Sequence, residues 1–551
     1  MMNDIKETTM KVEVAKQVAG RERVSALRVL ACAWPALLLA TVCLLPFLNK
    51  AFVIDDPHFL TMAQQIIEHP THPMDFTICW NIGPGCTKAY LLTPGNALLG
   101  YVLVPTVLTG AHEWSAHLTQ LLLVWIAVVA MASLTLRFGW DKQHAIVGSL
   151  LLVAVAPFLA MASTAMPDIL ATAVALVAME RLAAWKTEQR WSQGAAAAVA
   201  LGLAGFARSH LALMLPLAAF YLFDNAPLWE WPGQVRRRFW LWMPVVAGSA
   251  LLAAIIAITR EHNLALNPPV AFSGLWNILP NVIGYLIYFV FPFPLALCWV
   301  ANRLKRRKLF PVIVLIVAAG FTIFIHPRFF WVVAFVGLCM MADLLYETLK
   351  RHEHTGIFLM LWILIPLPIA YYGHLPAKYL LPCMPAVIFL CFRLMEGLSV
   401  KVFRVAAIAM IVISAGYSVL ILRTDAEYAN FGRDALYELI RPPVAAGEKV
   451  WFEGQWSSYW YAPLAGATLT FPNGPQPKPG DFLVVGDHGE DGGKAALLRF
   501  PNRTLVNKVT HTYRFGRTMG DGIGLYSNRI GYWMWGIGPG PDDEYELWRI
   551  D

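Results

Sequence analysis

Long apolar runs, each about the length of a membrane-spanning helix, recur along most of the chain. They begin at Leu27 and continue almost to Leu422, separated by short clusters of charge, Pro and Gly. A helix needs about 20 apolar residues to cross roughly 30 Å of hydrocarbon, so the pattern predicts about thirteen transmembrane helices. The predicted spans are 27–47, 116–136, 144–162, 168–185, 194–207, 210–223, 239–259, 278–300, 309–325, 329–346, 356–372, 379–396 and 405–422.

Composition agrees with this pattern. The chain of 551 residues is 58% hydrophobic and 14% charged, with a mean hydropathy of +0.53, whereas soluble proteins have about 25% charged residues. The expected fold class is therefore a polytopic α-helical membrane protein. The first run lacks a small-residue cleavage pattern, which predicts an uncleaved signal anchor.

Basic residues of the short loops predict the orientation, because Lys and Arg stay on the cytoplasmic side. They cluster on alternate loops and in the N-terminal segment, which places residues 1–26 in the cytoplasm. The net charge of +7 reflects this bias and contact with anionic lipid, and does not indicate a nucleic-acid partner. The clusters are Arg137 and Lys142, Arg181 to Arg190, Arg236 to Arg238, Arg303 to Lys308, Lys350 and Arg351, and Arg393 to Arg404.

Two segments are expected on the opposite, extracytoplasmic side. The first loop, 48–115, is unusually long for a compact bundle, and such loops are often functional. After residue 425 the pattern changes to short β-like runs separated by Gly, Pro and Asp turns. We expect a transmembrane domain over 27–424 and a small α/β or α+β domain over 425–551.

Two of the eight cysteines lie outside the predicted spans. Cys79 and Cys86 are seven positions apart in the first loop, where an oxidising compartment would allow a disulfide. Zinc binding by this pair is disfavoured, because no second pair accompanies it.

Three carboxylates are candidates for chemistry on the outer side. Asp55 and Asp56 are adjacent and follow the first span, where mutual repulsion and a low dielectric can raise the pKa of one of them so that it serves as a base. Asp168 opens a later span on the same side. Its alternative role is that of an ordinary helix cap.

Basic and polar residues of the later outward turns predict a cationic rim around these carboxylates. A cation at such a turn can simply extend its charge to the interface, but an ionisable group within the membrane is a functional candidate by default. Together these residues suit a substrate that carries a phosphate and a hydroxyl to be deprotonated. They are Arg208 and His210, His326 and Arg328, and His374, Lys378 and Tyr379.

Five segments resemble the GT-C glycosyltransferases of the protein mannosyltransferase and lipid A aminoarabinose transferase superfamily. Other templates, namely a P-loop, GxGxxG after a strand, HExxH and GxSxG, are missing from the sequence. The resemblance covers roughly residues 25 to 425 in order. The segments are VIDDPHFLTMAQQII, LLTPGNALLGYVLVPTVLTGAHEWSAHL, MPDILATAVALVAMERL, LGLAGFARSHLALMLPLAAFYL and AKYLLPCMPAVIFL.

This resemblance implies roles for the candidate residues by position. Asp55 would be the general base for an acceptor hydroxyl, Asp56 a helper or ligand, and Asp168 a second acidic site. The donor phosphate would be held by a further group of residues, namely Arg208, Lys378, Arg328, His210, Tyr379 and His58. The chain departs from many relatives at Arg208, where they have Lys, and at His117, where they have Arg, which leaves donor recognition open.

The resemblance implies inverting transfer from a polyprenyl-phosphate sugar at the outer face of a bacterial plasma membrane. A lipid donor also suits a chain that has no nucleotide-binding motif. A divalent metal (Mg, Mn or Zn) at Asp55 and Asp168 is left open, as is the acceptor: a lipid-linked glycan, lipid A or another envelope polymer, or a protein hydroxyl. Two other functions compete with this one. A transporter predicts repeats with broken helices, which the sequence lacks, and a membrane anchor with a binding tail does not explain the clustered charges.

Overall fold

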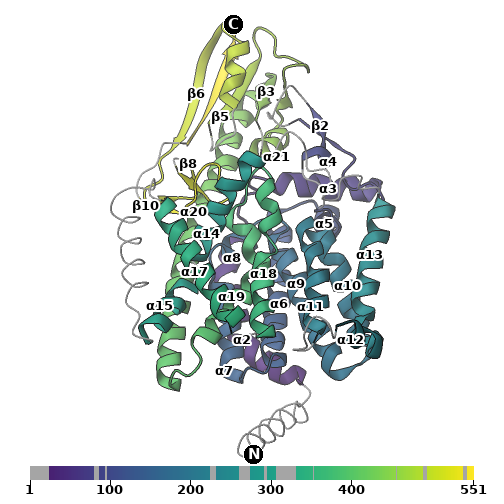
Figure 1. Ribbon diagram of the computed structural model, residues 1–551. Helices are drawn as coiled ribbons and strands as arrows, with labels where there is room; N and C mark the ends of the chain where they lie inside the picture. The colour runs from purple at the N-terminus through teal and green to yellow at the C-terminus, as the bar shows by residue number, and fades with distance from the viewer. Residues whose placement is uncertain are drawn as a thin grey trace, which may run out of the picture.

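A helical bundle carries a small mixed α/β domain at one end (Figure 1). The computed structural model describes residues 24–79, 86–92, 96–223, 231–259, 274–290, 295–305, 330–350, 353–454, 456–487, 493–520, 522–537 and 543–551. We call the end of the bundle that bears the C-terminal domain the domain end. The expected fold class, a polytopic helical protein with a C-terminal α/β domain, is confirmed.

Seven helical segments of the described residues are long and apolar enough to cross a membrane. An eighth candidate is a pair of helices bent by 64°, Leu275–Val290 with Leu295–Arg303. The seven are Ala26–Phe47, Glu113–Arg137, Phe239–Thr259, Phe330–Lys350, His354–Tyr371, Ala377–Leu394 and Val400–Ala445.

The expected number of about thirteen spans stays a prediction. Four of the expected spans, 144–162, 168–185, 194–207 and 210–223, correspond to helices that are shorter or more polar than the rest. The expected span 309–325 lies outside the described residues. The bundle helices are α2 (Ala26–Leu44), α5 (Leu98–Leu108), α6 (Glu113–Arg137), α7 (Lys142–Ala154), α8 (Phe158–Ala162), α9 (Asp168–Glu188), α10 (Trp191–Ala207), α11 (Met214–Leu222), α12 (Trp231–Arg237), α13 (Met243–Thr259), α14 (Ile278–Val290), α15 (Leu295–Lys305), α17 (Phe330–Lys350), α18 (His354–Leu364) and α19 (Met384–Leu394).

Short 3₁₀ helices join or extend these elements, and several of them lie at the domain end. They are η1 (Leu45–Phe47), η2 (Ser209–Leu213), η4 (Phe239–Trp242), η5 (Leu275–Asn277), η7 (Leu367–Tyr371) and η8 (Ala377–Cys383). The ridge of α2 that faces away from the bundle exposes large apolar side chains, as a surface in contact with lipid requires. They include Leu27, Leu30, Trp34 and Leu38.

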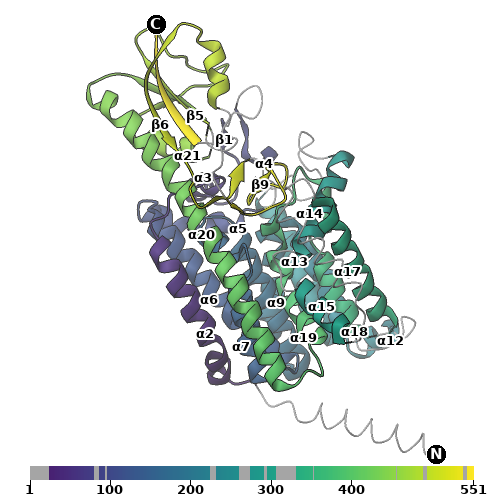
Figure 2. The same cartoon turned by 90° about the vertical axis from the view of Figure 1, so that its left-hand side faces the viewer.

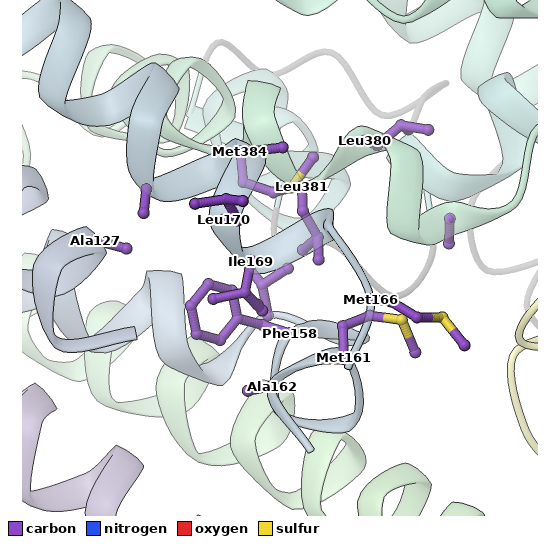
Figure 3. Packing of buried hydrophobic residues seen from close by; sticks show 14 of the residues in the cluster. Ala127, Phe158, Met161, Ala162, Met166, Ile169, Leu170, Leu380, Leu381 and Met384 are labelled. Atoms are coloured by element: carbon purple, nitrogen blue, oxygen red, sulfur yellow. The ribbon is translucent and has the colours of Figure 1, made fainter. Parts of the chain in front are cut away.

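The interior below the domain end is closely packed and apolar. Side chains of α8, of the turn before α9, of α9 and of η8 meet there, and Figure 3 shows Phe158, Met161, Met166 and Leu381 among them. This core fixes the start of α9 and the whole of η8, which supply charged residues to the domain end.

The first loop returns along the domain end. Its main helix is α3 (Asp56–Glu68), which begins with Pro57 in its first turn, a position where Pro is tolerated because the amide needs no helical partner. A two-stranded hairpin, β1 (Thr77–Ile78) with β2 (Thr87–Lys88), follows and leads into α4 (Ala89–Leu92). A disulfide joins Cys79 to Cys86 at this hairpin.

A single long helix, α20 (Val400–Ala445), runs from the bundle into the C-terminal domain (Figure 2). Ser399 caps its start by accepting the amide of Val402. The expected span 405–422 and the expected boundary at residue 425 both fall within this helix, which continues without a break across that boundary.

The C-terminal domain is built on a five-stranded sheet in the order β4-β3-β5-β11-β6. β3 is parallel to β4 and β5, whereas β11 is antiparallel to β5 and β6. Short strand pairs, β7 with β10 and β8 with β9, bring the segment 516–537 down onto the bundle. The elements are β3 (Val450–Glu453), α21 (Ser457–Leu464), β4 (Thr468–Leu469), β5 (Phe482–Asp487), η9 (Gly493–Arg499), β6 (Arg503–His511), β7 (Gly516–Arg517), β8 (Met519–Gly520), β9 (Ile523–Gly524), β10 (Gly536–Ile537) and β11 (Asp543–Ile550).

Candidate active site

Asp55 lies at the start of α3, directly below the C-terminal domain. Its side chain is 31% exposed, and its Oδ2 is 3.8 Å from the Nζ of Lys378, which is almost fully buried. Burial raises the pKa of the Asp55 carboxyl, Lys378 and Arg208 oppose that rise, and Asp168 adds to it. Asp55 is thus a carboxylate that a substrate can reach, with cations beside it.

Asp56 is fully buried and has a different environment. Its two oxygens accept the backbone amides of Val53, at 3.0 Å, and of Ala165, at 2.8 Å. Burial raises its pKa to about 7, although Lys50 and the two amides favour the charged form. Asp56 therefore fastens the start of α3 to the turn before α9, and its oxygens are already occupied.

Asp168 forms a buried ion pair with Arg208. Its Oδ1 is 2.6 Å from the guanidinium of Arg208, and both side chains are less than a tenth exposed. Arg208 follows the end of α10, where the backbone becomes extended, and its guanidinium lies over the ring of Tyr379 at 4.3 Å. Among the described residues the Asp168 Oδ2 and the Arg208 Nε have no hydrogen-bond partner.

Lys378 and Tyr379 reach the site from η8. The Nζ of Lys378 also contacts the sulfur of Met166 at 3.2 Å and lies 5.8 Å from the ring of Tyr379. Tyr379 thus lies against both cations, Arg208 and Lys378. Two buried positive charges beside one accessible carboxylate make an arrangement that can hold an anionic group next to a base.

His374 and the loop of the C-terminal domain around Ser527 close one side of the site. The Nε2 of His374 is 3.1 Å from the hydroxyl of Tyr379, and its Nδ1 is 3.4 Å from Ser527 Oγ. Burial and the neighbouring cations lower the pKa of His374 to about 3, so its ring is neutral near pH 7. Asn528 accepts the amide of Leu375, which holds the loop in place.

The remaining predicted residues lie in other settings. His58 packs between Phe59 and Phe76, and burial lowers its pKa to about 3, which favours the neutral ring. His210 is half-buried in η2, two residues after Arg208, and its Nε2 has no partner among the described residues. Arg328 and its neighbour His326 lie outside the described residues.

The structure also joins residues that the sequence did not single out. Lys50 pairs with Asp425 of α20, and Tyr526 of the C-terminal domain donates to both oxygens of Asp425 at 2.8 and 2.9 Å. Lys50 and Asp425 are 375 positions apart, so local patterns could not connect them. The sequence signal for this pair is that Lys50 and Asp425 each lie at the outer end of a predicted span.

The residues that were considered for a metal do not form a metal centre by themselves. Across the described part of the chain, no group of three or more His, Cys, Asp or Glu side chains could hold an ion. Asp168 is paired with Arg208, and Asp55 faces Lys378.

A large cavity among the described residues lies elsewhere. It measures about 1620 Å³ and is lined by residues at the far ends of α6, α9 and α19, including Arg137, Glu188 and Arg393. Since α9 begins at Asp168 and ends at Glu188, its 21 residues separate the cavity from the carboxylates by about 30 Å. The candidate site at the domain end is thus distinguished by its charged residues and not by this cavity.

Comparison with known proteins supports the fold. No protein-family model and no curated protein sequence matches the chain. The structure of ArnT from Cupriavidus metallidurans bound to undecaprenyl phosphate matches with a TM-score of 0.50 at 13% identity, covering 87% of this chain and 96% of that chain. ArnT in the apo state gives the same coverage and TM-score at 12% identity.

A third structure, an oligosaccharyltransferase from Archaeoglobus fulgidus, covers 80% of this chain and 63% of that chain at 14% identity. Its TM-score of 0.42 is too low to support an argument. The ArnT structures are similar to this chain in fold, over nearly its whole length. The chain thus has the fold of the ArnT structures, in agreement with the fold that the resemblance of its sequence motifs implies.

Proposed function

We propose that the protein transfers a sugar from a polyprenyl-phosphate donor to an acceptor hydroxyl, with inversion and with Asp55 as the general base. The observation that carries this proposal is the pairing of one accessible carboxylate with buried cations. Asp55 is 31% exposed, whereas Lys378 at 3.8 Å is 3% exposed, and Arg208 lies over the ring of the neighbouring Tyr379 at 4.3 Å.

This arrangement suits the two changes of charge in the reaction. The acceptor hydroxyl donates its proton to Asp55 as its oxygen attacks the sugar carbon. The bond from that carbon to the phosphate oxygen breaks, and the electron pair leaves with the phosphate. Arg208 and Lys378 would stabilise the departing anion through charge-assisted hydrogen bonds.

A lipid-linked donor is supported by the fold and by the position of the site. One of the ArnT structures with this fold is bound to undecaprenyl phosphate. The site lies at the domain end, and the basic ends of the helices, such as Arg137 and Arg393, lie at the other. With the basic end in the cytoplasm, the site would face outward across a bacterial plasma membrane.

The acceptor is proposed to be an envelope glycolipid or glycan, such as lipid A, with a protein hydroxyl as the alternative. Aromatic residues of the C-terminal domain are candidates for stacking on the sugar rings of such an acceptor. Trp451 and Trp533 are buried, 3% and 8% exposed, so they pack the domain. Trp456 and Trp460 are half-buried and are better placed for contact with an acceptor.

The test is sugar transfer by the purified protein in liposomes, with a panel of polyprenyl-phosphate sugars. We compare wild type with Asp55→Asn and with a matched control, Asp75→Asn, which changes an exposed carboxylate of the same loop that pairs with Lys88. The proposal predicts that Asp55→Asn abolishes turnover without lowering the thermal transition and that Asp75→Asn is active.

Two results would count against the proposal. Full turnover by Asp55→Asn would remove Asp55 as the base. Failure of the wild type to release sugar from any lipid donor, combined with movement of a lipid-linked sugar across the bilayer, would favour the transporter.

A further inference from the structure

The segment that leads to Asp55 has its backbone held by side chains from distant elements. Residues 50–54 are buried and form no helix or strand. The amide of Ala51 donates to Asn430 at 2.9 Å, and the amide of Phe52 donates to the hydroxyl of Tyr461 at 2.7 Å. Ser457 donates to the carbonyl of Phe52 at 3.1 Å. Buried backbone groups must be paired, and here α20 and α21 of the outer region supply the partners.

The backbone next to Asp55 is strained. Ile54 has φ of 52°, a left-handed conformation that is costly for a β-branched residue. Such a conformation persists only when the surrounding structure enforces it. The contacts of residues 51 and 52 on one side and of Asp56 on the other enforce it here.

A buried charge cluster lies beside the same segment. Lys50 and Asp425 have fully buried side chains and pair with each other, and Lys50 also donates to Ser163 at 3.2 Å. Tyr526 donates to Asp425, and its ring lies 5.2 Å from the Nζ of Lys378. Tyr526 therefore contacts both the pair that holds the segment and the cation that faces Asp55.

We propose that Lys50, Asp425 and Tyr526 are positioning residues through which the C-terminal domain sets the place of Asp55 and Lys378. This inference rests on the proposed function, since it concerns the residue that acts as base. A carboxylate displaced by about 1 Å from its reacting position can lose on the order of 100-fold in rate. Loosening the cluster should therefore lower kcat more than it raises KM.

The experiment compares Tyr526→Phe with Tyr513→Phe. Both tyrosines are 3% exposed, and both donate to a carboxylate, but the partner of Tyr513 is Asp543 in β11, which belongs to the outer sheet. We expect Tyr526→Phe to lower kcat at least about 10-fold, with KM for the donor changed less than about 2-fold, and Tyr513→Phe to change neither. Equal effects of the two variants on kcat would overturn the inference.

A second variant covers the case in which Tyr526→Phe does not fold. The double variant Lys50→Met with Asp425→Leu removes both charges together, which proteins tolerate far better than the loss of one partner. We expect it to fold and to lose kcat as Tyr526→Phe does. Wild-type turnover by this folded double variant would refute the positioning role. Asp55→Asn is measured in parallel. Full turnover by that variant would refute the proposed role of Asp55 as base, which is a different failure from that of the positioning role.

Discussion

Replacing Arg208 by Lys tests whether the guanidinium holds the leaving phosphate. The substitution keeps a positive charge but removes the planar group that Asp168 and Tyr379 hold in place. Lys cannot form the same fork of hydrogen bonds or lie flat on the ring. The site of the variant would still attract an anion, but the side chain at position 208 would no longer present the planar set of hydrogen-bond donors over the Tyr379 ring.

The expected size of the effect follows from the lost contacts. One charge-assisted hydrogen bond contributes about 1.5–3 kcal/mol, and the cation over the Tyr379 ring contributes about 0.5–1 kcal/mol. A loss of about 2–4 kcal/mol in the transition state corresponds to roughly 30- to 1000-fold in kcat/KM. The ground state holds a phosphate as well, so part of the loss appears in KM.

The assay measures initial rates of sugar release from the donor in liposomes, with the thermal transition of each variant recorded. Arg503→Lys is the matched control, because Arg503 lies over the ring of Trp548 at 5.0 Å in the outer sheet. We expect the control to keep wild-type kcat/KM. A folded Arg208→Lys variant with kcat/KM within about threefold of wild type would refute the reasoning, since threefold corresponds to about 0.7 kcal/mol, less than the loss of the single hydrogen bond.

Three further predictions concern the same end of the molecule. The kcat/KM should rise with pH as Asp55 loses its proton. Lys378→Met should move this rise to higher pH, because the substitution removes a cation that lowers the Asp55 pKa. An unchanged pH profile would show that Lys378 does not influence the pKa of Asp55. Asp56→Asn should lower the free energy of unfolding by about 1–3 kcal/mol, because Asn has one acceptor oxygen for two backbone amides. Denaturant titration measures this change, and an unchanged free energy of unfolding would show that the second amide needs no partner. Replacing both Cys79 and Cys86 by Ser should lower the free energy of unfolding by about 2 kcal/mol, because the disulfide closes a short loop in the unfolded chain. Equal stability of the wild type and the double variant, measured without reductant, would contradict this.

Local sequence patterns were enough to single out three residues that the structure brings together in the candidate site. Asp55, Arg208 and Lys378 each interrupt or end an apolar run at the outer side, and charges at such positions must gather where the bundle allows it. The structure brings all three around Tyr379. Which carboxylate remains accessible was beyond the sequence, because Asp55 and Asp56 are adjacent and differ only in what covers them.

Long-range pairings were not readable from the sequence. Lys50 and Asp425 appear singly as charges at the ends of two spans, and only the tertiary structure, which brings the segment after α2 to α20, joins them. His58 shows a different limit, because its motif predicts phosphate binding, which stays a prediction, and the packing of its ring between Phe59 and Phe76 depends on tertiary contacts. Burial, which separates these cases, depends on tertiary contacts rather than on residue type.

The unbroken course of α20 limits how the outer domain can move. A helix of 46 residues is a rod of about 69 Å, of which about 30 Å lies beyond Asp425. A swivel at the membrane surface would require this rod to break, and a tilt of about 5° would shift its far end by less than about 3 Å. The structure above Asp55 therefore keeps a nearly constant shape, so that under the proposed function large acceptors would be selected by the direction from which they reach Asp55.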